Sequence, residues 1–142
     1  MEEGRQRKRV LFICTHNAAR SHMAEGFLNA RDRDRYEALS AGTEPSHVNP
    51  LAVSVMAEAG IDISGHRSKS VDEFVGQELD CVVTVCDHAN EACPFFPGGK
   101  KRLHHGFQDP SSWRGSEQEK LALFRRVRDE IKAWIEETFD AL

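Results

Sequence analysis

The chain has 142 residues, about the size of one domain, and its 39% hydrophobic and 30% charged residues are typical of a folded globular protein rather than a disordered or fibrous one. Its 19 lysines and arginines and 23 acidic residues leave a formal net charge of −4, which argues against nucleic acid as the main partner. No stretch approaches the roughly 20 apolar residues that span a bilayer, and the first residues lack a secretion signal, so we expect a single cytoplasmic domain over residues 1–142 that binds no membrane.

The first predicted elements are a strand, a tight loop and a helix. Residues 10–13 form a continuous apolar run, typical of a strand that is buried on both faces of a parallel sheet, and the run ends at Cys14. From Ala18 onward apolar residues recur at helical spacing, so a helix follows the strand without a linker. A second strand is predicted over residues 36–41, and Gly42 stops it.

Capping residues mark the next two predicted helices. Asn49 suits the N-cap and Pro50 the first position of a helix, and Gly60 is typical of the residue just beyond a helix end. Ser70 and Glu73 have the spacing of a capping box, which predicts that a short third helix opens there.

Two more strands and a long helix are predicted in the rest of the chain. The β-branched run 81–85 predicts a central strand that ends at Cys86, and residues 101–107 predict a fourth strand. Ser116 and Glu119 form another capping-box pattern, before a helix with one apolar stripe. Strands that alternate with helices in this way predict an α/β domain of three layers, in which a four-stranded parallel sheet has helices on both faces.

A cysteine and an arginine frame the loop between the first predicted strand and helix. In such a loop successive backbone N–H groups point inward and the helix dipole adds positive potential, an arrangement that binds tetrahedral oxyanions. Arg20 can grip two oxygens of the anion, Cys14 can attack as a thiolate, and Ser21 can donate a hydrogen bond to the sulfur. The residues predicted to bind the substrate are Thr15, His16, Asn17, Ala18, Ala19 and Arg20.

Asp109, which precedes Pro110, lies in a loop after the fourth predicted strand. Because the carboxyl ends of parallel strands lie at the same edge of the sheet, this loop can lie close to the loop that contains Cys14. An oxygen leaves a tetrahedral oxyanion more easily when a protonated acid lies opposite the nucleophile, and Asp109 is the candidate for that acid. Asp-Pro is also a common turn dipeptide, so the pattern alone leaves both interpretations open.

Cys86 and Cys93 are separated by six residues, which is neither the spacing of a thioredoxin motif nor that of a tight zinc pair. A loop that brought their sulfurs together would permit disulfide exchange with Cys14. Two unrelated thiols would fit the same spacing equally well. Cys81 lies inside an apolar strand and is expected to be an inert core residue.

Segments spread over nearly the whole chain, from Val10 to about Phe139, match the pattern of one protein family. They are CTHNAARSHMAEG at 14–26, SAGTEP at 40–45, VNPLAV at 48–53, GIDISGHRSK at 60–69, VVTVCDHANEACPFFP at 82–97, DP at 109–110 and FRRVRDEI at 124–131. In these segments the sequence resembles the arsenate reductases of the low-molecular-weight protein tyrosine phosphatase fold, in particular the thioredoxin-coupled type. The resemblance implies that fold, with its three α/β/α layers, for this chain.

The resemblance also implies that three thiols act in turn to reduce arsenate to arsenite, for arsenic detoxification. Cys14 would attack arsenate held by the loop and Arg20, while Asp109 protonates the departing oxygen. Cys86 would then attack the Cys14 sulfur and release arsenite, and Cys93 would attack Cys86 to leave a disulfide that thioredoxin reduces. We therefore expect arsenate and thioredoxin as partners, no cofactor and no metal, and a monomer.

One position beside the loop departs from the family pattern. Some relatives bind potassium there through the equivalents of Asn17, Glu25 and Ser40 together with an aspartate. The aspartate position is Lys69 in this chain, and its ammonium could replace the ion by pairing with Glu25. We therefore predict activity that does not depend on potassium.

Three alternatives stay open. A tyrosine phosphatase of the same fold would use the same loop, although the acid loop at 109–113 lacks the tyrosines usual in those enzymes. A reductase could instead take its electrons from glutathione with glutaredoxin, or from another small thiol, although such relatives often lack one or both of the later cysteines. A non-catalytic metal-binding protein is the third, but the seven histidines show no ligand spacing along the sequence.

Overall fold

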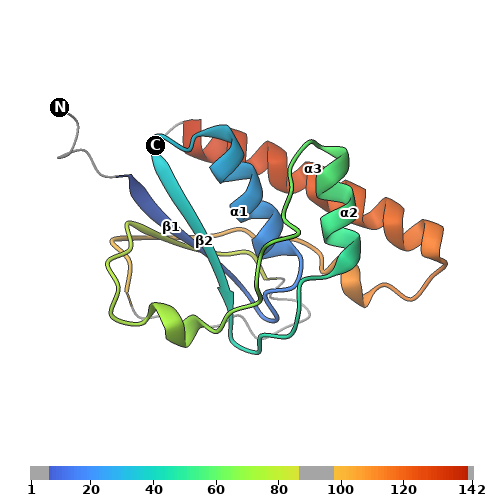
Figure 1. Cartoon of the computed structure of the whole chain (residues 1–142), viewed down its shortest axis with the longest axis horizontal. Helices are drawn as coiled ribbons and strands as arrows, with labels where there is room; N and C mark the ends of the chain where they lie inside the picture. The colour runs from blue at the N-terminus through green and yellow to red at the C-terminus, as the bar shows by residue number, and fades with distance from the viewer. Residues whose placement is uncertain (1–6, 87–97, 141–142) are drawn as a thin grey trace.

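The computed structural model describes residues 7–86 and 98–140. Its four strands are β1 (Lys8–Cys14), β2 (Tyr36–Gly42), β3 (Cys81–Thr84) and β4 (Lys101–His104), and they form one sheet in the order β2-β1-β3-β4 (Figure 1). Every neighbouring pair is parallel, so the predicted four-stranded parallel sheet is confirmed. The fourth strand ends at His104, short of the predicted residue 107, because its partner β3 ends at Thr84, directly opposite.

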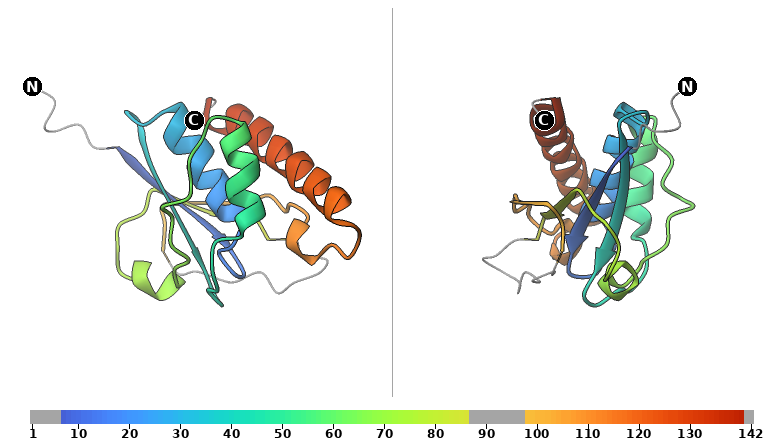
Figure 2. Two further views of the ribbon diagram at one scale, coloured as in Figure 1. Left: turned by 45° about the vertical axis from the view of Figure 1, so that its right-hand side comes forward. Right: turned by 90° about the vertical axis from the view of Figure 1, so that its left-hand side faces the viewer.

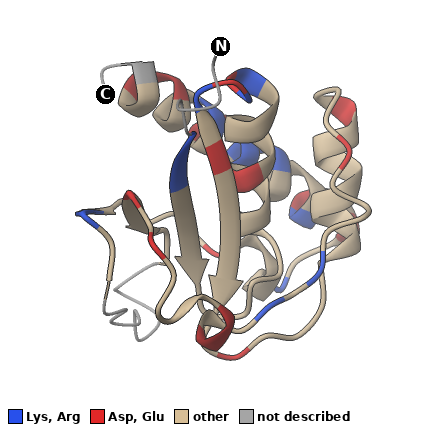
Figure 3. Cartoon of the chain, turned by 60° about the vertical axis from the view of Figure 1, so that its left-hand side comes forward, with Lys and Arg blue, Asp and Glu red and all other residues tan. Residues whose placement is uncertain are grey.

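In the described part of the chain, three α-helices accompany the sheet. They are α1 (Arg20–Arg31), α2 (Pro50–Glu58) and α3 (Glu117–Asp140). Two short 3-10 helices, η1 (Val71–Phe74) and η2 (Pro110–Ser112), lie in the connections. Within residues 7–86 and 98–140, no helix is long and apolar enough to cross a membrane. Basic and acidic residues are interspersed along the same elements (Figure 3).

Most of the predicted caps form. The Asn49 side chain accepts a hydrogen bond from the N–H of Leu51 at 2.8 Å, so α2 begins where the sequence predicts. Ser116 and Glu119 cap α3 reciprocally, each side chain accepting from the other's backbone N–H. Ser70 caps the short helix η1 through the N–H of Asp72, but the predicted capping box is incomplete because the Glu73 carboxylate binds the Arg67 guanidinium instead.

Alternate residues of β1 face two apolar clusters, and this alternation creates the layers. Val10 and Phe12 pack with apolar side chains of α1, α2 and α3, which gather on one side of the sheet (Figure 2). Leu11 and Ile13 pack on the opposite face, where Phe74 of η1 covers them. The predicted three-layer α/β arrangement is confirmed, and among the described residues the helical cover of the second face is the single turn η1.

The long helix α3 is held by its apolar stripe. Phe124, Val127, Ile131 and Ile135 are all at most 1% exposed, and burial of each such side chain contributes roughly 1.5–3 kcal/mol. The stripe fixes α3 against α1 and the sheet. The loops that precede α3 are thereby held near the carboxyl ends of the strands.

Strand register brings two cysteines to the same edge. Ile13 of β1 lies opposite Thr84 of β3, and the N–H of Val85 still donates to the Ile13 carbonyl at 2.9 Å. Cys14 and Cys86 therefore follow neighbouring strands at the carboxyl edge of the sheet, as the sequence predicts.

Candidate active site

The loop after β1 is held open from outside. The carbonyl oxygens of Thr15, His16, Asn17 and Ala18 accept hydrogen bonds, in that order, from the backbone N–H groups of Glu44 and Ser46, the His22 ring and the N–H of Asn49. In a planar trans peptide the N–H points opposite to the carbonyl oxygen. Because these carbonyls point outward, the N–H groups that follow them face the interior of the loop, where they can surround an anion.

Backbone geometry and the start of α1 complete this anion cradle. Asn17 has φ +49°, a left-handed conformation that is common where successive N–H groups converge. No side chain caps the N-terminus of α1 at Ala19, and the positive end of its dipole faces the loop. The loop passes so close to Gly42 that a Cβ there would lie 2.6 Å from the Thr15 carbonyl oxygen, so the end of β2 has to be glycine.

Cys14 lies at the base of the cradle and is 2% exposed. Its sulfur is 3.0 Å from the hydroxyl oxygen of Ser21, and the Asn17 amide donates to that same oxygen at 2.8 Å. Since the amide supplies a hydrogen to the Ser21 oxygen, the hydroxyl hydrogen is left to donate to the Cys14 sulfur. A thiolate at Cys14 would be stabilised by this bond, as the sequence predicts for Ser21.

Arg20 connects the cradle to the loop after β4. Its guanidinium is buried and donates through Nη1 to the carbonyl oxygen of Phe107 at 3.1 Å. Nη2 lies 3.8 Å from Oδ2 of Asp109. The other carboxylate oxygen, Oδ1, accepts from the N–H and the hydroxyl of Ser111 at 3.0 and 2.6 Å, which fixes the orientation of the Asp109 carboxyl group. The structure thus brings Arg20 and Asp109 together, 89 residues apart in sequence.

The remaining predicted cradle residues differ in exposure. Ala19 is buried, Thr15 and Ala18 are half-buried, and His16 is exposed. The His16 ring donates through Nδ1 to the Glu44 carbonyl oxygen at 3.1 Å, so it fastens the cradle to the segment after β2.

Cys86 is fully buried just beyond β3 and is disulfide-bonded, whereas Cys14 and Cys81 carry free thiols. Burial raises the pKa of Cys81 to about 11, which keeps this thiol protonated and agrees with its expected inert role. The predicted third thiol, Cys93, lies outside the described residues.

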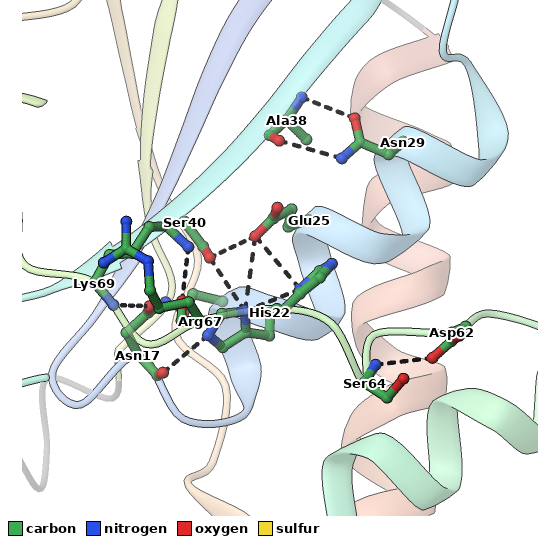
Figure 4. A network of polar contacts seen from close by, with 12 residues as sticks. Asn17, His22, Glu25, Asn29, Ala38, Ser40, Asp62, Ser64, Arg67 and Lys69 are labelled. Atoms are coloured by element: carbon green, nitrogen blue, oxygen red, sulfur yellow. Dashed lines mark hydrogen bonds and ion pairs between the residues drawn. The ribbon is translucent and has the colours of Figure 1, made fainter. Parts of the chain in front are cut away.

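Lys69 occupies the position at which the family pattern has a potassium-binding aspartate in some relatives. Its ammonium donates to the carbonyl oxygen of Arg67 at 2.8 Å, and its backbone N–H donates to the Asn17 side chain at 2.7 Å (Figure 4). Burial lowers the pKa of Lys69, while the negative charge of Glu25 opposes that shift. Among the described residues the predicted ion pair between Lys69 and Glu25 does not form, because the ammonium binds the Arg67 carbonyl instead, and Glu25 acts on Lys69 only through its charge.

We expect equal activity in potassium and in sodium at constant ionic strength, because Lys69 already supplies the positive charge. Steady-state rates measured in the two chlorides would check this. A clear rise in rate with potassium alone would contradict it.

Sequence reasoning missed the roles of two groups. The Phe107 carbonyl that holds Arg20 is a backbone atom and leaves no signal in the side-chain pattern. Asn17 was expected to line the cradle and to match a potassium ligand of some relatives, but not to join Ser21 to the backbone of Lys69, as its side chain does. The burial and the left-handed backbone conformation of Asn17 indicate this structural role, and both are visible only in the structure.

Comparisons with known proteins cover the whole site. The family model for low molecular weight phosphotyrosine protein phosphatase matches residues 9–142. The arsenate reductase of Halalkalibacterium halodurans is 48% identical over 125 residues, which are 88% of this chain and 90% of that protein.

Solved structures match over a similar length. An arsenate reductase in its phosphate-binding state has a TM-score of 0.79 at 32% identity and covers 92% of this chain and 95% of its own. A thioredoxin-dependent arsenate reductase of Corynebacterium glutamicum has a TM-score of 0.74 at 26% identity, over 99% of this chain and 64% of its own. The likeness therefore extends well beyond the cysteine loop.

Proposed function

The chain belongs to the low molecular weight phosphotyrosine protein phosphatase family, and we propose that it is an arsenate reductase regenerated by thioredoxin. The observation that carries the proposal is the position of Cys86, which follows the strand next to that of Cys14. A phosphatase needs only water for its second step, whereas reduction needs a second thiol within reach of the first.

The first step forms a bond between the Cys14 sulfur and arsenic. The cradle and Arg20 neutralise the charge of arsenate, and the Ser21 hydroxyl stabilises the attacking thiolate. One arsenate oxygen leaves as water after Asp109 gives it a proton, which leaves arsenic in its oxidised state on Cys14. Asp109 is suitably positioned because it lies beside the guanidinium that holds the anion.

The second step transfers two electrons to arsenic. The Cys86 thiolate attacks the Cys14 sulfur, the sulfur–arsenic bond breaks, and its electron pair stays with arsenic, which leaves as arsenite. Cys93 then attacks Cys86, frees the Cys14 thiolate and forms a second disulfide. The dithiol of thioredoxin reduces that disulfide, so each arsenate consumes one dithiol and no cofactor is required.

The proposed electron donor, thioredoxin, indicates the cellular compartment in which the reaction takes place. Thioredoxin keeps thiols reduced in the cytoplasm, so we place the reaction there.

Arsenite release with each candidate donor tests the proposal. Reduced protein given arsenate is expected to release many equivalents of arsenite with thioredoxin and thioredoxin reductase, and about one equivalent without a donor. Sustained arsenite release with glutathione and glutaredoxin alone would show that the electron donor is glutathione rather than thioredoxin. Hydrolysis of an aryl phosphate without any arsenite formation would show that the protein is a phosphatase and not a reductase.

A further inference from the structure

A cluster of two histidines and a glutamate lies behind the anion cradle. His22 and Glu25 are on the first turns of α1, and His66 comes from the segment between α2 and η1. Nδ1 of His22 is 3.1 Å from Nδ1 of His66, and Oε1 of Glu25 is 3.7 Å from both nitrogens. The His22 side chain is 0% exposed, Glu25 13% and His66 21%, so the cluster reaches solvent beside His66.

The hydrogen bonds of His22 fix which ring nitrogen faces the cluster with a lone pair. Nε2 lies 3.0 Å from the Asn17 carbonyl oxygen, which can only accept, so Nε2 carries the hydrogen. Burial, with the nearby charges of Lys69 and His66, lowers the pKa of His22 to about 3, so the ring is neutral. Nδ1 of His22 is therefore an acceptor, in the tautomer that histidine ligands adopt when a backbone carbonyl orients them.

Ser40 leaves that acceptor without a hydrogen. Its hydroxyl donates to Oε1 of Glu25 at 2.5 Å, although its oxygen is also 3.3 Å from Nδ1 of His22 (Figure 4). A hydroxyl has one hydrogen, and here the carboxylate takes it. Among the residues that the structure describes, the lone pair on Nδ1 of His22 can accept a hydrogen bond from Nδ1 of His66, or it can coordinate a cation.

The spacing of the three atoms suits a small cation. Distances of 3.1, 3.7 and 3.7 Å define a triangle in which one point lies about 2.0 Å from all three atoms. Zinc binds imidazole nitrogen and carboxylate oxygen at about 2.0–2.2 Å. Two nitrogen ligands favour zinc and similar divalent transition metals over magnesium, calcium or potassium, which prefer oxygen ligands.

We propose that His22, Glu25 and His66 bind a divalent cation of the zinc class. Occupancy replaces the hydrogen shared between the two imidazoles, and the carboxylate offsets the positive charge of Lys69, which opposes cation binding. Water from the side of His66 completes the coordination. The site is separate from the anion cradle, and it does not depend on the proposed arsenate chemistry.

The cluster is joined to the nucleophile by hydrogen bonds. His22 holds the Asn17 carbonyl, the Asn17 amide donates to Ser21, and the Ser21 hydroxyl meets the Cys14 sulfur. A bound cation fixes the His22 ring at one end of this series. Metal occupancy therefore steadies the cradle from behind without blocking it.

Cobalt titration of the reduced full chain tests the ligand set. We expect one tightly bound Co²⁺ with weak visible bands and no sulfur charge-transfer band, and stoichiometric displacement by Zn²⁺. The variant with Cys14, Cys86 and Cys93 all replaced by serine is expected to bind equally well. A sulfur charge-transfer band at the first equivalent, or loss of binding in that variant, would assign the metal to the thiols and overturn the proposal.

Competition with a chromophoric zinc chelator measures each ligand's contribution. His66→Gln is expected to weaken zinc binding at least about tenfold, and so is Glu25→Gln, whereas His47→Gln, at an exposed histidine outside the cluster, is expected to change nothing. His66 is partly exposed, so its replacement tests the site without removing a core residue. Equal zinc affinity in all three variants and the original chain would overturn the proposal.

Discussion

Cys14→Ser is expected to abolish both arsenite formation and any hydrolysis of aryl phosphates, a loss of about 10⁴-fold or more. The cradle would still bind the anion, because its N–H groups and Arg20 remain. A serine hydroxyl in the same place is a far weaker nucleophile, since the cradle stabilises a thiolate but cannot deprotonate an alcohol. Arsenite release at a saturating donor concentration would check the loss of activity, and a separate measurement of anion binding would check that the cradle is intact.

Ser21→Ala is the matched control. It removes the hydroxyl that lies 3.0 Å from the Cys14 sulfur but keeps the nucleophile, so we expect a loss of roughly 10- to 100-fold, the value of one hydrogen bond to a charged group. Comparable losses in the two variants would mean that the loop, rather than the thiol, had been damaged. Residual turnover in Cys14→Ser close to that of the original chain would remove Cys14 from the mechanism.

Cys93→Ser is expected to release about one arsenite per enzyme molecule and then stop. Attack by Cys86 on Cys14 still reduces arsenic, but no third thiol is left to free Cys14. The enzyme should stall with Cys14 joined to Cys86. Rapid quenching with arsenite quantification, followed by peptide mapping of the disulfide, measures both the yield and the product.

Cys81→Ser controls for the loss of a cysteine as such. Cys81 is a buried thiol of β3 with a raised pKa, so its replacement should leave multiple turnovers intact. Sustained turnover of Cys93→Ser with thioredoxin would show that the relay does not pass through Cys93.

Much of the fold was predictable because local signals and burial agree. The apolar run before Cys14 and the β-branched run before Cys86 each predict a strand buried on both faces, and both are central in the sheet. The Asn49 and Ser116 caps are local hydrogen bonds between residues close in sequence. The end of the fourth strand was missed because it depends on where its partner strand stops.

The site was predictable only in part. The order of strand, loop and helix places Cys14 and Arg20 together, and the rule that strand ends share an edge brings in Asp109. The bond from Lys69 to the Arg67 carbonyl depends on backbone positions that no spacing encodes.

The histidine cluster was hidden for a related reason. His22 and His66 are 44 residues apart, so they show no ligand spacing along the chain. They meet because the segment after α2 returns across the first turns of α1. Contacts of this kind follow from tertiary packing, and sequence periodicity does not contain them.

NADPH consumption in a coupled assay tests the central claim most directly. Reduced protein with arsenate, thioredoxin, thioredoxin reductase and NADPH should oxidise about one NADPH per arsenate, and Cys86→Ser should abolish this oxidation because arsenic stays bound to Cys14. Arsenate-dependent oxidation in the original chain and none in Cys86→Ser is the predicted result. Equal NADPH consumption by the two proteins, or none by the original chain, would contradict a thioredoxin-coupled relay through Cys86.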